Sequence, residues 1–428
     1  MSHGPIHLAL ASAAALGLVA LSVSARAVEL WMDNEGHRSL SLDPAVKVSG
    51  LGTYAPDDPW LYPERSSALG LFRLRLGFEA DLGARTNAEL AYEHRARWTS
   101  SAGGTSLSSG VLSSFAEAPY RIRQLDWELF EGGTRFDYRH EIDRALVAWH
   151  PKWGDVTLGR QAIGLGRGVI FSAVDMFSPF SPAEVDREWR RGVDALRLEY
   201  RTSDTSAVEF LGVFGETWDD SAVLGRVRGY LGDVDGEFIL GKRAEDVMAA
   251  GILSAILADA ETHLELALFH LDEPQVENDA FGGTELVGKI VAGGSYTFAV
   301  GNGLTLLGEY HYSGFGFEDS EDATWRMRDA DVLERFLRGD SQILGRHGLA
   351  AQLSYSFTPM IAGGLLLLGS PADGSGLVSP SVNWDISQRT SLRFSAFVPW
   401  GQAPRWGQLR SEYGATPASL FAQLNVYF

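Results

Sequence analysis

The chain has 428 residues, of which 45% are apolar and 21% are charged, and it contains no cysteine. Its 55 acidic and 36 basic residues give a net charge of −19, which argues against a nucleic-acid partner because phosphate binding needs an excess of cations. The missing cysteines exclude disulfides, cysteine zinc sites, iron–sulfur clusters and thiol nucleophiles, and we expect no cofactor.

An uncharged apolar run occupies residues 8–23. Ala25 and Ala27 follow it and fit an A-x-A cleavage site. The run is marginal for a transmembrane helix, which needs about 20 apolar residues. We therefore predict a signal peptide over residues 1–27 and a single mature domain over residues 28–428.

Apolar and charged residues alternate along residues 69–82, where Phe72 and Leu74 flank Arg73, and Arg75 follows. This period of two is typical of a strand with one face in water and the other on lipid or core. Similar segments recur along the chain, and 246–257 is the weakest because it reads almost as well as a helix. The predicted strands are 45–53, 69–82, 86–98, 138–149, 154–163, 192–202, 206–216, 246–257, 261–271, 285–299, 304–314, 347–357, 361–369, 377–387, 391–400 and 418–428.

These segments give 16 strands, and 18 is the alternative because the stretch 99–137 has room for another pair around 121–130. Tight turns at 83–85, 203–205, 259–260, 301–303, 358–360 and 387–389 alternate with long segments at 99–137, 163–191, 217–245, 315–346 and 401–417. Short turns on one rim and long loops on the other are typical of outer-membrane barrels. We predict an all-β transmembrane antiparallel barrel in the outer membrane of a Gram-negative bacterium.

The last strand ends the chain at Phe428. Its outward residues are apolar and its inward residues include Gln423 and Asn425. An amphipathic last strand with a final aromatic residue looks like the signature that the barrel assembly machinery recognises. We expect that machinery, outer-membrane lipid and lipopolysaccharide to be partners.

The stretch from Arg144 to Tyr200 contains RALVAWHPKWGDVTLGRQ, a long loop with VDMFSPFSP and DREWRRG, and then VDALRLEY. It is similar to outer-membrane porin-like proteins of the alginate-export type and their relatives, in which a strand ending Gly-Arg-Gln precedes a loop that folds into the pore. The matching residues are Gly159, Arg160 and Gln161, with Asp194 in the next strand. The resemblance is local, and this chain departs from the cation-lined family pattern by alternating arginines with acidic residues.

The period of two also predicts which side chains face the lumen. Arginines opposite acidic residues make a transverse field that passes polar solutes, whereas cross-strand ion pairs would only stabilise the wall; both readings stay open. The predicted pore-lining residues are Arg73, Arg75, Glu89, Glu93, Arg95, Arg97, Arg160, Gln161, Asp194, Arg197 and Glu199.

The loop 163–191 is the predicted constriction, since it is long and rich in charges. A loop folded into a wide barrel narrows its channel. The alternative is an exposed cap loop outside the lumen. The charged residues assigned to the constriction are Asp175, Asp186, Arg187, Glu188, Arg190 and Arg191.

Four further patterns in the sequence carry weaker signals. Gly164–Gly168 resembles a nucleotide loop, but no helix is predicted after it. The spacing of His263, Glu265, Lys289, Glu309 and His311 favours a solvated lumen cluster over a metal site. Acidic runs at 318–322 and between Asp272 and Asp279 indicate solvated loops or cation bridges to lipopolysaccharide. Residues 329–338 have helical spacing.

We predict a passive channel, not an enzyme, for polar solutes that are anionic, zwitterionic or saccharides. One alternative is a lipid hydrolase, for which His94 or His270 lies on the apolar face. The other is a barrel that sheathes an export or electron-transfer partner, and this requires a wide lumen without a folded-in loop. The sequence leaves the substrate, the sign of the selectivity and the oligomeric state open.

Overall fold

The computed structural model describes residues 28–100, 111, 119–130, 135–271 and 285–428. The predicted signal peptide at 1–27 and the acidic run between Asp272 and Asp279 lie outside the described residues. Within the described part of the chain, no helix is both long enough and apolar enough to span a membrane.

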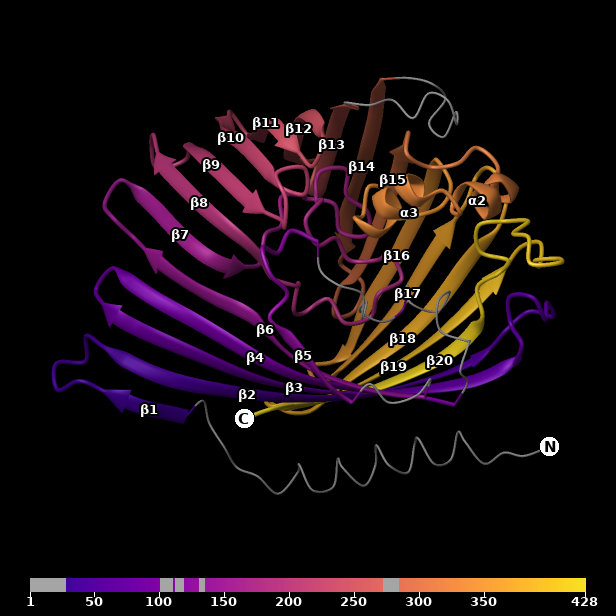
Figure 1. Ribbon diagram of the computed structural model, residues 1–428, viewed down its shortest axis with the longest axis horizontal. Helices are drawn as coiled ribbons and strands as arrows, with labels where there is room; N and C mark the ends of the chain where they lie inside the picture. The colour runs from indigo at the N-terminus through magenta and orange to yellow at the C-terminus, as the bar shows by residue number, and fades with distance from the viewer. Residues whose placement is uncertain (1–27, 101–110, 112–118, 131–134, 272–284) are drawn as a thin grey trace.

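A single antiparallel sheet closes into a barrel (Figure 1). Among the described residues the sheet has 20 strands. Two short ones, β1 (Val28–Met32) and β5 (Asp126–Phe130), only extend the wall, and 20 − 2 leaves 18 in the ring. The ring is closed by β2 and β20, whose pairing runs from Ala45 opposite Tyr427 to Tyr54 opposite Ala418. The ring strands are β2 (Ser39–Tyr54), β3 (Ser66–Gly83), β4 (Thr86–Thr99), β6 (Phe136–Trp149), β7 (Gly154–Gln161), β8 (Val193–Arg201), β9 (Ala207–Phe214), β10 (Ala222–Leu231), β11 (Val234–Arg243), β12 (Asp246–Leu257), β13 (Ala260–His270), β14 (Leu286–Phe298), β15 (Leu304–Ser313), β16 (His347–Thr358), β17 (Ile361–Gly369), β18 (Gly376–Ser387), β19 (Thr390–Trp400) and β20 (Ala418–Tyr427).

The all-β barrel is confirmed, the prediction of 16 strands is wrong, and the alternative of 18 is correct in number. The additional pair, however, is the β10–β11 hairpin inside 217–245, a segment predicted to be a loop. Gly225, Gly229 and Gly236 take outward positions in this hairpin, beside the exposed Val227 and Phe238. Because glycine replaces apolar residues there, the period of two is too weak to read from the sequence. The segment 246–257 is a strand, β12, as predicted.

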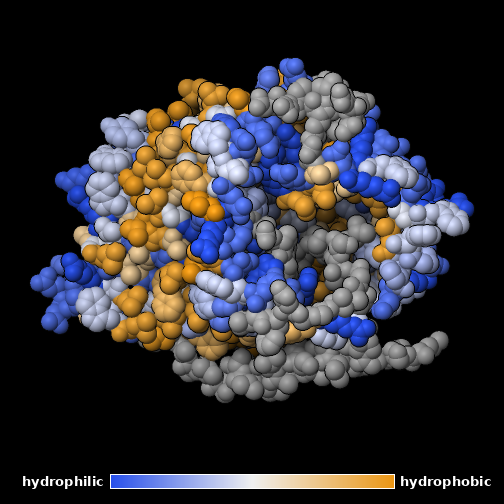
Figure 2. Space-filling view, in the orientation of Figure 1, coloured by the Kyte–Doolittle hydropathy of each residue, from blue (hydrophilic) through white to orange (hydrophobic). Residues whose placement is uncertain are grey.

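The outer wall is apolar, as a strand facing lipid requires. On β11, Phe238 and Leu240 are 53% and 51% exposed, whereas Ile239 between them is fully buried. Figure 2 shows an apolar band on the wall between two more hydrophilic ends. Trp153 contacts both Trp149 and Tyr200 beside the short turns, where barrels carry aromatic girdles.

The two rims differ in the length of their connections. The β12–β13 turn consists of Ala258 and Asp259, both with positive φ (48° and 68°), as in the tight primed turns of hairpins. The opposite rim carries the long connections, including 314–346 with α2 (Ser320–Arg326) and α3 (Ala330–Leu337). The helix predicted within 329–338 is therefore confirmed. Outer-membrane barrels keep short turns in the periplasm and long loops outside the cell.

Candidate functional site

The segment 162–192, which connects β7 to β8, crosses the lumen. Its residues hydrogen-bond to Glu265 on β13 and Glu309 on β15, and also to Lys47 on β2 and Arg393 on β19. None of these strands is a neighbour of β7 or β8 in the ring. Figure 1 shows the segment inside the barrel. We call residues 162–192 the crossing segment.

Two buried carboxylates anchor the first half of the crossing segment. Glu309 accepts the backbone N–H groups of Val169 (2.6 Å), Ile170 (2.9 Å) and Phe171 (2.8 Å). Glu265 accepts the N–H groups of residues 167, 168, 173 and 174, and the Ser172 hydroxyl at 2.8 Å. A carboxylate that accepts several N–H groups forms strong charge-assisted hydrogen bonds, so both strands hold the segment firmly.

The second half is anchored to the opposite wall. Lys47 Nζ lies 2.7 Å from Asp186 Oδ1 and 3.9 Å from the centroid of the Trp189 ring, and Arg73 lies 4.7 Å from the same ring. Burial opposes the ionisation of Asp186, but the Lys47 ammonium outweighs it and the pKa of Asp186 is lowered. Cations over an indole face add an attractive contribution. Sequence reasoning missed Lys47 and Trp189 because neither belongs to an alternating charge pattern.

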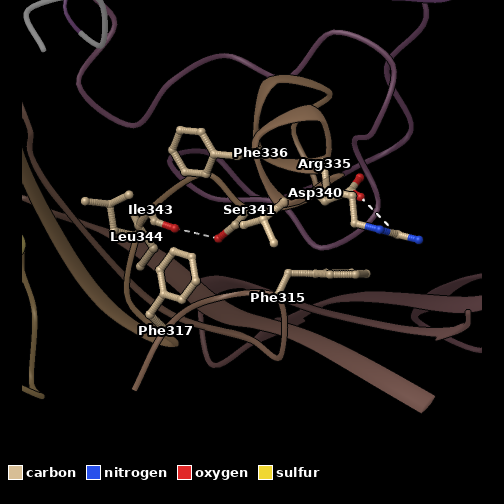
Figure 3. A pocket seen from close by; sticks show the side chains of 9 residues that line it. Phe315, Phe317, Arg335, Phe336, Asp340, Ser341, Ile343 and Leu344 are labelled. Carbon is tan, nitrogen blue, oxygen red and sulfur yellow. Dashed lines mark hydrogen bonds and ion pairs between the residues drawn. The ribbon is translucent and has the colours of Figure 1, made fainter. Parts of the chain in front are cut away.

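The external loop 314–346 packs onto the crossing segment. Gln342 accepts the Ser172 N–H at 2.7 Å and donates to the Phe180 carbonyl at 3.0 Å. Inside this loop, Arg335 pairs with Asp340 beside an apolar cluster that contains Phe315 (Figure 3). The cavity between these side chains measures only about 10 Å³, room for no more than one water. It is therefore part of the packing rather than a ligand site.

Predicted lining residues of β3 and β4 come together with acidic residues of β6 in a buried ion-pair network. Glu93 is 0% exposed and accepts hydrogen bonds from Arg73 (2.7 Å), Arg75 and Arg95 (2.9 Å). Arg95 also pairs with Glu141 at 3.0 Å. The guanidiniums are occupied by protein carboxylates, so cross-strand pairing describes these residues better than an open arginine ladder.

Arg160 and Asp194 lie in the wall, which corrects their predicted place in the lining. They share the outward strand face with Leu158 and Tyr200, which are 60% and 55% exposed. Arg160 binds Asp194 at 2.8 Å, the Ile142 carbonyl at 2.9 Å and the Arg123 carbonyl at 2.6 Å. Because β7 ends at Gln161, this guanidinium and the segment 120–130 fill the opening between β6 and β8.

The remaining predicted lining residues differ in their exposure. The side chains of Arg97 and Arg197 are 32% and 35% exposed, and among the described residues Arg97 pairs with Asp137 and Arg197 with Glu209. The Glu89 side chain is 34% exposed. Gln161 is buried and donates to the Ala195 carbonyl at 3.1 Å, and Glu199 accepts Arg228 at 2.7 Å.

The predicted constriction residues mostly hold the crossing segment together. Arg187 donates to the Val169 carbonyl at 2.6 Å, and Arg190 donates to the Ser178 carbonyl at 2.9 Å and pairs with Asp175. Burial, together with the nearby Arg95, lowers the pKa of Arg191 to about 10. Glu188 has a 41% exposed side chain, although it also pairs with Lys47 at 2.7 Å and accepts the Tyr427 hydroxyl at 2.6 Å.

The cluster predicted to be solvated is buried beneath the crossing segment. His311 and Glu265 are 0% exposed and Lys289 is 2% exposed. The Phe171 ring stacks on His311 with 5.0 Å between centroids. Within the described residues, no group of three or more potential ligands is placed to hold a metal ion. These residues therefore form the surface on which the crossing segment packs.

On the lipid face, His94 lies in a cluster of rings. Its Nδ1 is 2.6 Å from the Tyr138 hydroxyl, and its ring stacks on His140 at 5.7 Å. His140 in turn contacts the Tyr92 hydroxyl and the Trp127 ring. In the part of the chain that the structure describes, neither imidazole hydrogen-bonds to a serine, the nucleophile that the hydrolase alternative needs.

No protein-family model matches the chain, and no curated protein sequence does. Solved barrels do resemble it. Acinetobacter baumannii OccAB1 is 10% identical with a TM-score of 0.55, over 95% of this chain and 99% of that one. A. baumannii OccAB4 is 10% identical with a TM-score of 0.53, over 92% and 100%. Pseudomonas aeruginosa OccK11 (OpdR) is 11% identical with a TM-score of 0.53, over 95% and 99%. At these identities the likeness concerns the fold: the chain has the fold of the outer-membrane porins.

Proposed function

We propose that this protein is a passive diffusion channel for small polar solutes in the outer membrane of a Gram-negative bacterium. The observation that carries the proposal is the crossing segment inside a closed barrel. Barrels of 16–18 strands enclose an aqueous channel. A segment anchored to both walls reduces that channel to a size that discriminates between solutes.

The same segment disfavours the sheath alternative, because a polypeptide partner needs the space that residues 162–192 occupy. It supports the proposed constriction, in which the Glu188 carboxylate faces the channel while Asp175, Asp186, Arg187, Arg190 and Arg191 fix the shape of the segment. Rigid charged groups at a narrow point select solutes by charge and size.

We assign the selectivity to the lining residues that remain accessible. Arg97 and Arg197 are each about one-third exposed and would favour anionic or zwitterionic solutes, with Glu89 as the opposing charge. The local resemblance to alginate-export proteins is compatible with saccharides as further solutes. In this proposal the signal peptide 1–27 directs export, and the barrel assembly machinery recognises the end of the chain at Phe428 before insertion beside lipopolysaccharide.

Liposome swelling tests the proposal. The mature chain, residues 28–428, is reconstituted, and swelling rates are measured with a series of uncharged sugars of increasing size. We expect swelling that falls steeply with solute size. Swelling at the rate of protein-free liposomes for the smallest sugar, from a preparation shown to be folded, would contradict it.

A further inference from the structure

A second feature of the lumen lies on the side of the short turns, below the crossing segment. A cavity of about 230 Å³ is bounded by β8, the turn after it, β9, β10 and β11, and by Arg167 of the crossing segment. Pockets for drug-sized ligands measure roughly 300–1,000 Å³, so this cavity suits a smaller solute. Its lining includes Arg167, Arg201, Arg228, Tyr230, Asp235 and Ser206.

The three arginines of this cavity keep unused donors. Arg167, Arg201 and Arg228 have side chains that are 43%, 53% and 37% exposed. Within the described chain, each forms its hydrogen bonds through Nη2. Arg167 donates to Asp235 and Glu237, Arg201 donates to Asp155, and Arg228 donates to Glu199. Arg201 Nε also lies 3.8 Å from Glu199. A guanidinium has five N–H donors, so several remain for a ligand. Arg95 and Arg160, in contrast, are buried among protein acceptors.

The acidic groups balance these cations. The lining contains three arginines and three acids, Glu199, Asp204 and Asp235, so its formal charge is 3 − 3 = 0. The hydroxyls of Ser203, Thr205 and Ser206 complete the polar lining. A lone anion would meet as many carboxylates as guanidiniums there. A polyhydroxylated solute can instead accept from the arginines and donate to the acids at the same time.

One side of the cavity is aromatic. Tyr230 is 60% exposed although its position on β10, two residues beyond Arg228, points into the lumen. An exposed ring on a polar inner wall offers an apolar face together with a hydroxyl group. The face of a sugar ring has matching C–H groups, while its edge carries the hydroxyls.

We propose that this cavity is a binding subsite for one neutral sugar ring on the periplasmic side of the channel. This inference rests on the proposed channel function and names one of its substrate classes. Tyr230 stacks on the ring, Arg201 and Arg228 donate to its hydroxyl oxygens, and Asp235 accepts from its hydroxyl hydrogens. Such a subsite holds the sugar after it has passed the crossing segment.

Titration of the folded chain with D-glucose, followed by tryptophan and tyrosine fluorescence or by calorimetry, measures binding without requiring conduction. Tyr230→Ala touches no ion pair, and we expect it to weaken glucose binding roughly ten-fold, as loss of a well-placed contact does. Arg228→Gln is expected to do the same. Arg389→Gln is the matched control, because it removes one positive charge near the same rim but outside the cavity, and it should bind like the unaltered chain.

Single-channel recording in the same buffers separates the two proposals. A chain that conducts but does not bind glucose, or whose glucose affinity is unchanged in Tyr230→Ala and Arg228→Gln, overturns the subsite and leaves the channel intact. Saturable binding of inorganic phosphate in place of glucose also overturns it, since the arginines would then form an anion site. A chain that binds glucose as expected but never conducts supports the subsite and contradicts the channel.

Discussion

Glu309 accepts the backbone N–H of Phe171 at 2.8 Å, although 138 residues separate them along the chain. The strand β15 thereby holds the first half of the crossing segment. That segment begins at the end of β7, which lies on another part of the ring. Lys47 fixes the later part of the same segment to β2 through Asp186. The crossing segment is thus suspended between two walls of the barrel rather than attached only at its ends.

Glu309→Gln should loosen the crossing segment. An amide has one acceptor oxygen where the carboxylate has two, and it places N–H donors against the N–H groups of residues 169–171. An unsatisfied buried group costs roughly 1–3 kcal/mol. We expect larger and noisier single-channel currents. The control is Glu261→Gln, which changes an exposed residue on β13. If the currents of Glu309→Gln match those of Glu261→Gln in size and noise, Glu309 does not anchor the segment.

Arg160→Gln should lower the stability of the barrel. Removing one member of a buried pair costs roughly 3–5 kcal/mol, and here the carbonyls of Ile142 and Arg123 also lose a donor. We expect a clearly lower urea midpoint of unfolding, with unchanged ion selectivity in the folded fraction. An unchanged midpoint would mean that the guanidinium does not hold the wall between β6 and β8 together.

Arg97→Gln and Arg197→Gln should have the opposite profile. Both arginine side chains are about one-third exposed. For Arg97→Gln we expect a change of less than about 1 kcal/mol in stability, as for exposed ion pairs. Arg197→Gln should cost more, because its partner Glu209 is 2% exposed and keeps only Arg226 as a partner among the described residues. Loss of lumen cations should shift the reversal potential in a salt gradient toward cation selectivity, and the double variant should shift it further. If the reversal potentials of both variants equal that of the unaltered chain, selectivity lies elsewhere.

Contact between the external loops should depend on pH. Glu412 accepts the N–H groups of Leu344 (2.8 Å) and Gly345 (2.6 Å), and burial raises its pKa from 4.5 to about 7. The folded form therefore holds more protons than the unfolded form between these values. The stabilisation that this raised pKa adds to the free energy of unfolding is full below pH 4.5, and it is lost as the pH rises through 7.

We expect hydrogen exchange at residues 344–345, corrected for its intrinsic pH dependence, to accelerate from pH 5 to pH 8. Glu412→Gln cannot ionise and should give a flat corrected profile. An equally flat profile in the unaltered chain would contradict the assignment.

The sequence predicts the barrel well because lipid outside and water inside impose a period of two on every strand. This pattern identifies strands such as β3 and β4 from residues like Phe72 and Arg73. It fails at β10 and β11, where outward glycines remove the apolar half of the signal. The position of Arg160 was also unpredictable, because it depends on β7 ending early and on residues 120–130 filling the opening.

The candidate site is harder to read from the sequence, since its geometry depends on pairs that are distant in the chain. Alternation placed Arg75 and Glu93 on the inner face, but it could not show that they neutralise each other beneath the crossing segment. Nor could it pair Glu265 and Glu309 with backbone N–H groups, which carry no sequence signature. The arginines of the cavity on β8 and β10 are exposed and others are buried, and this difference depends on the folded structure rather than on the local sequence.

The proposed channel is tested by planar-bilayer recording of refolded residues 28–428, with the reversal potential measured under a salt gradient. We predict stable open steps of a narrowed channel, with anion preference that weakens in Arg97→Gln and Arg197→Gln. Folding and insertion are judged by the heat-modifiable mobility of the chain in gel electrophoresis. The channel proposal would be contradicted by a chain that folds and inserts but shows no open steps.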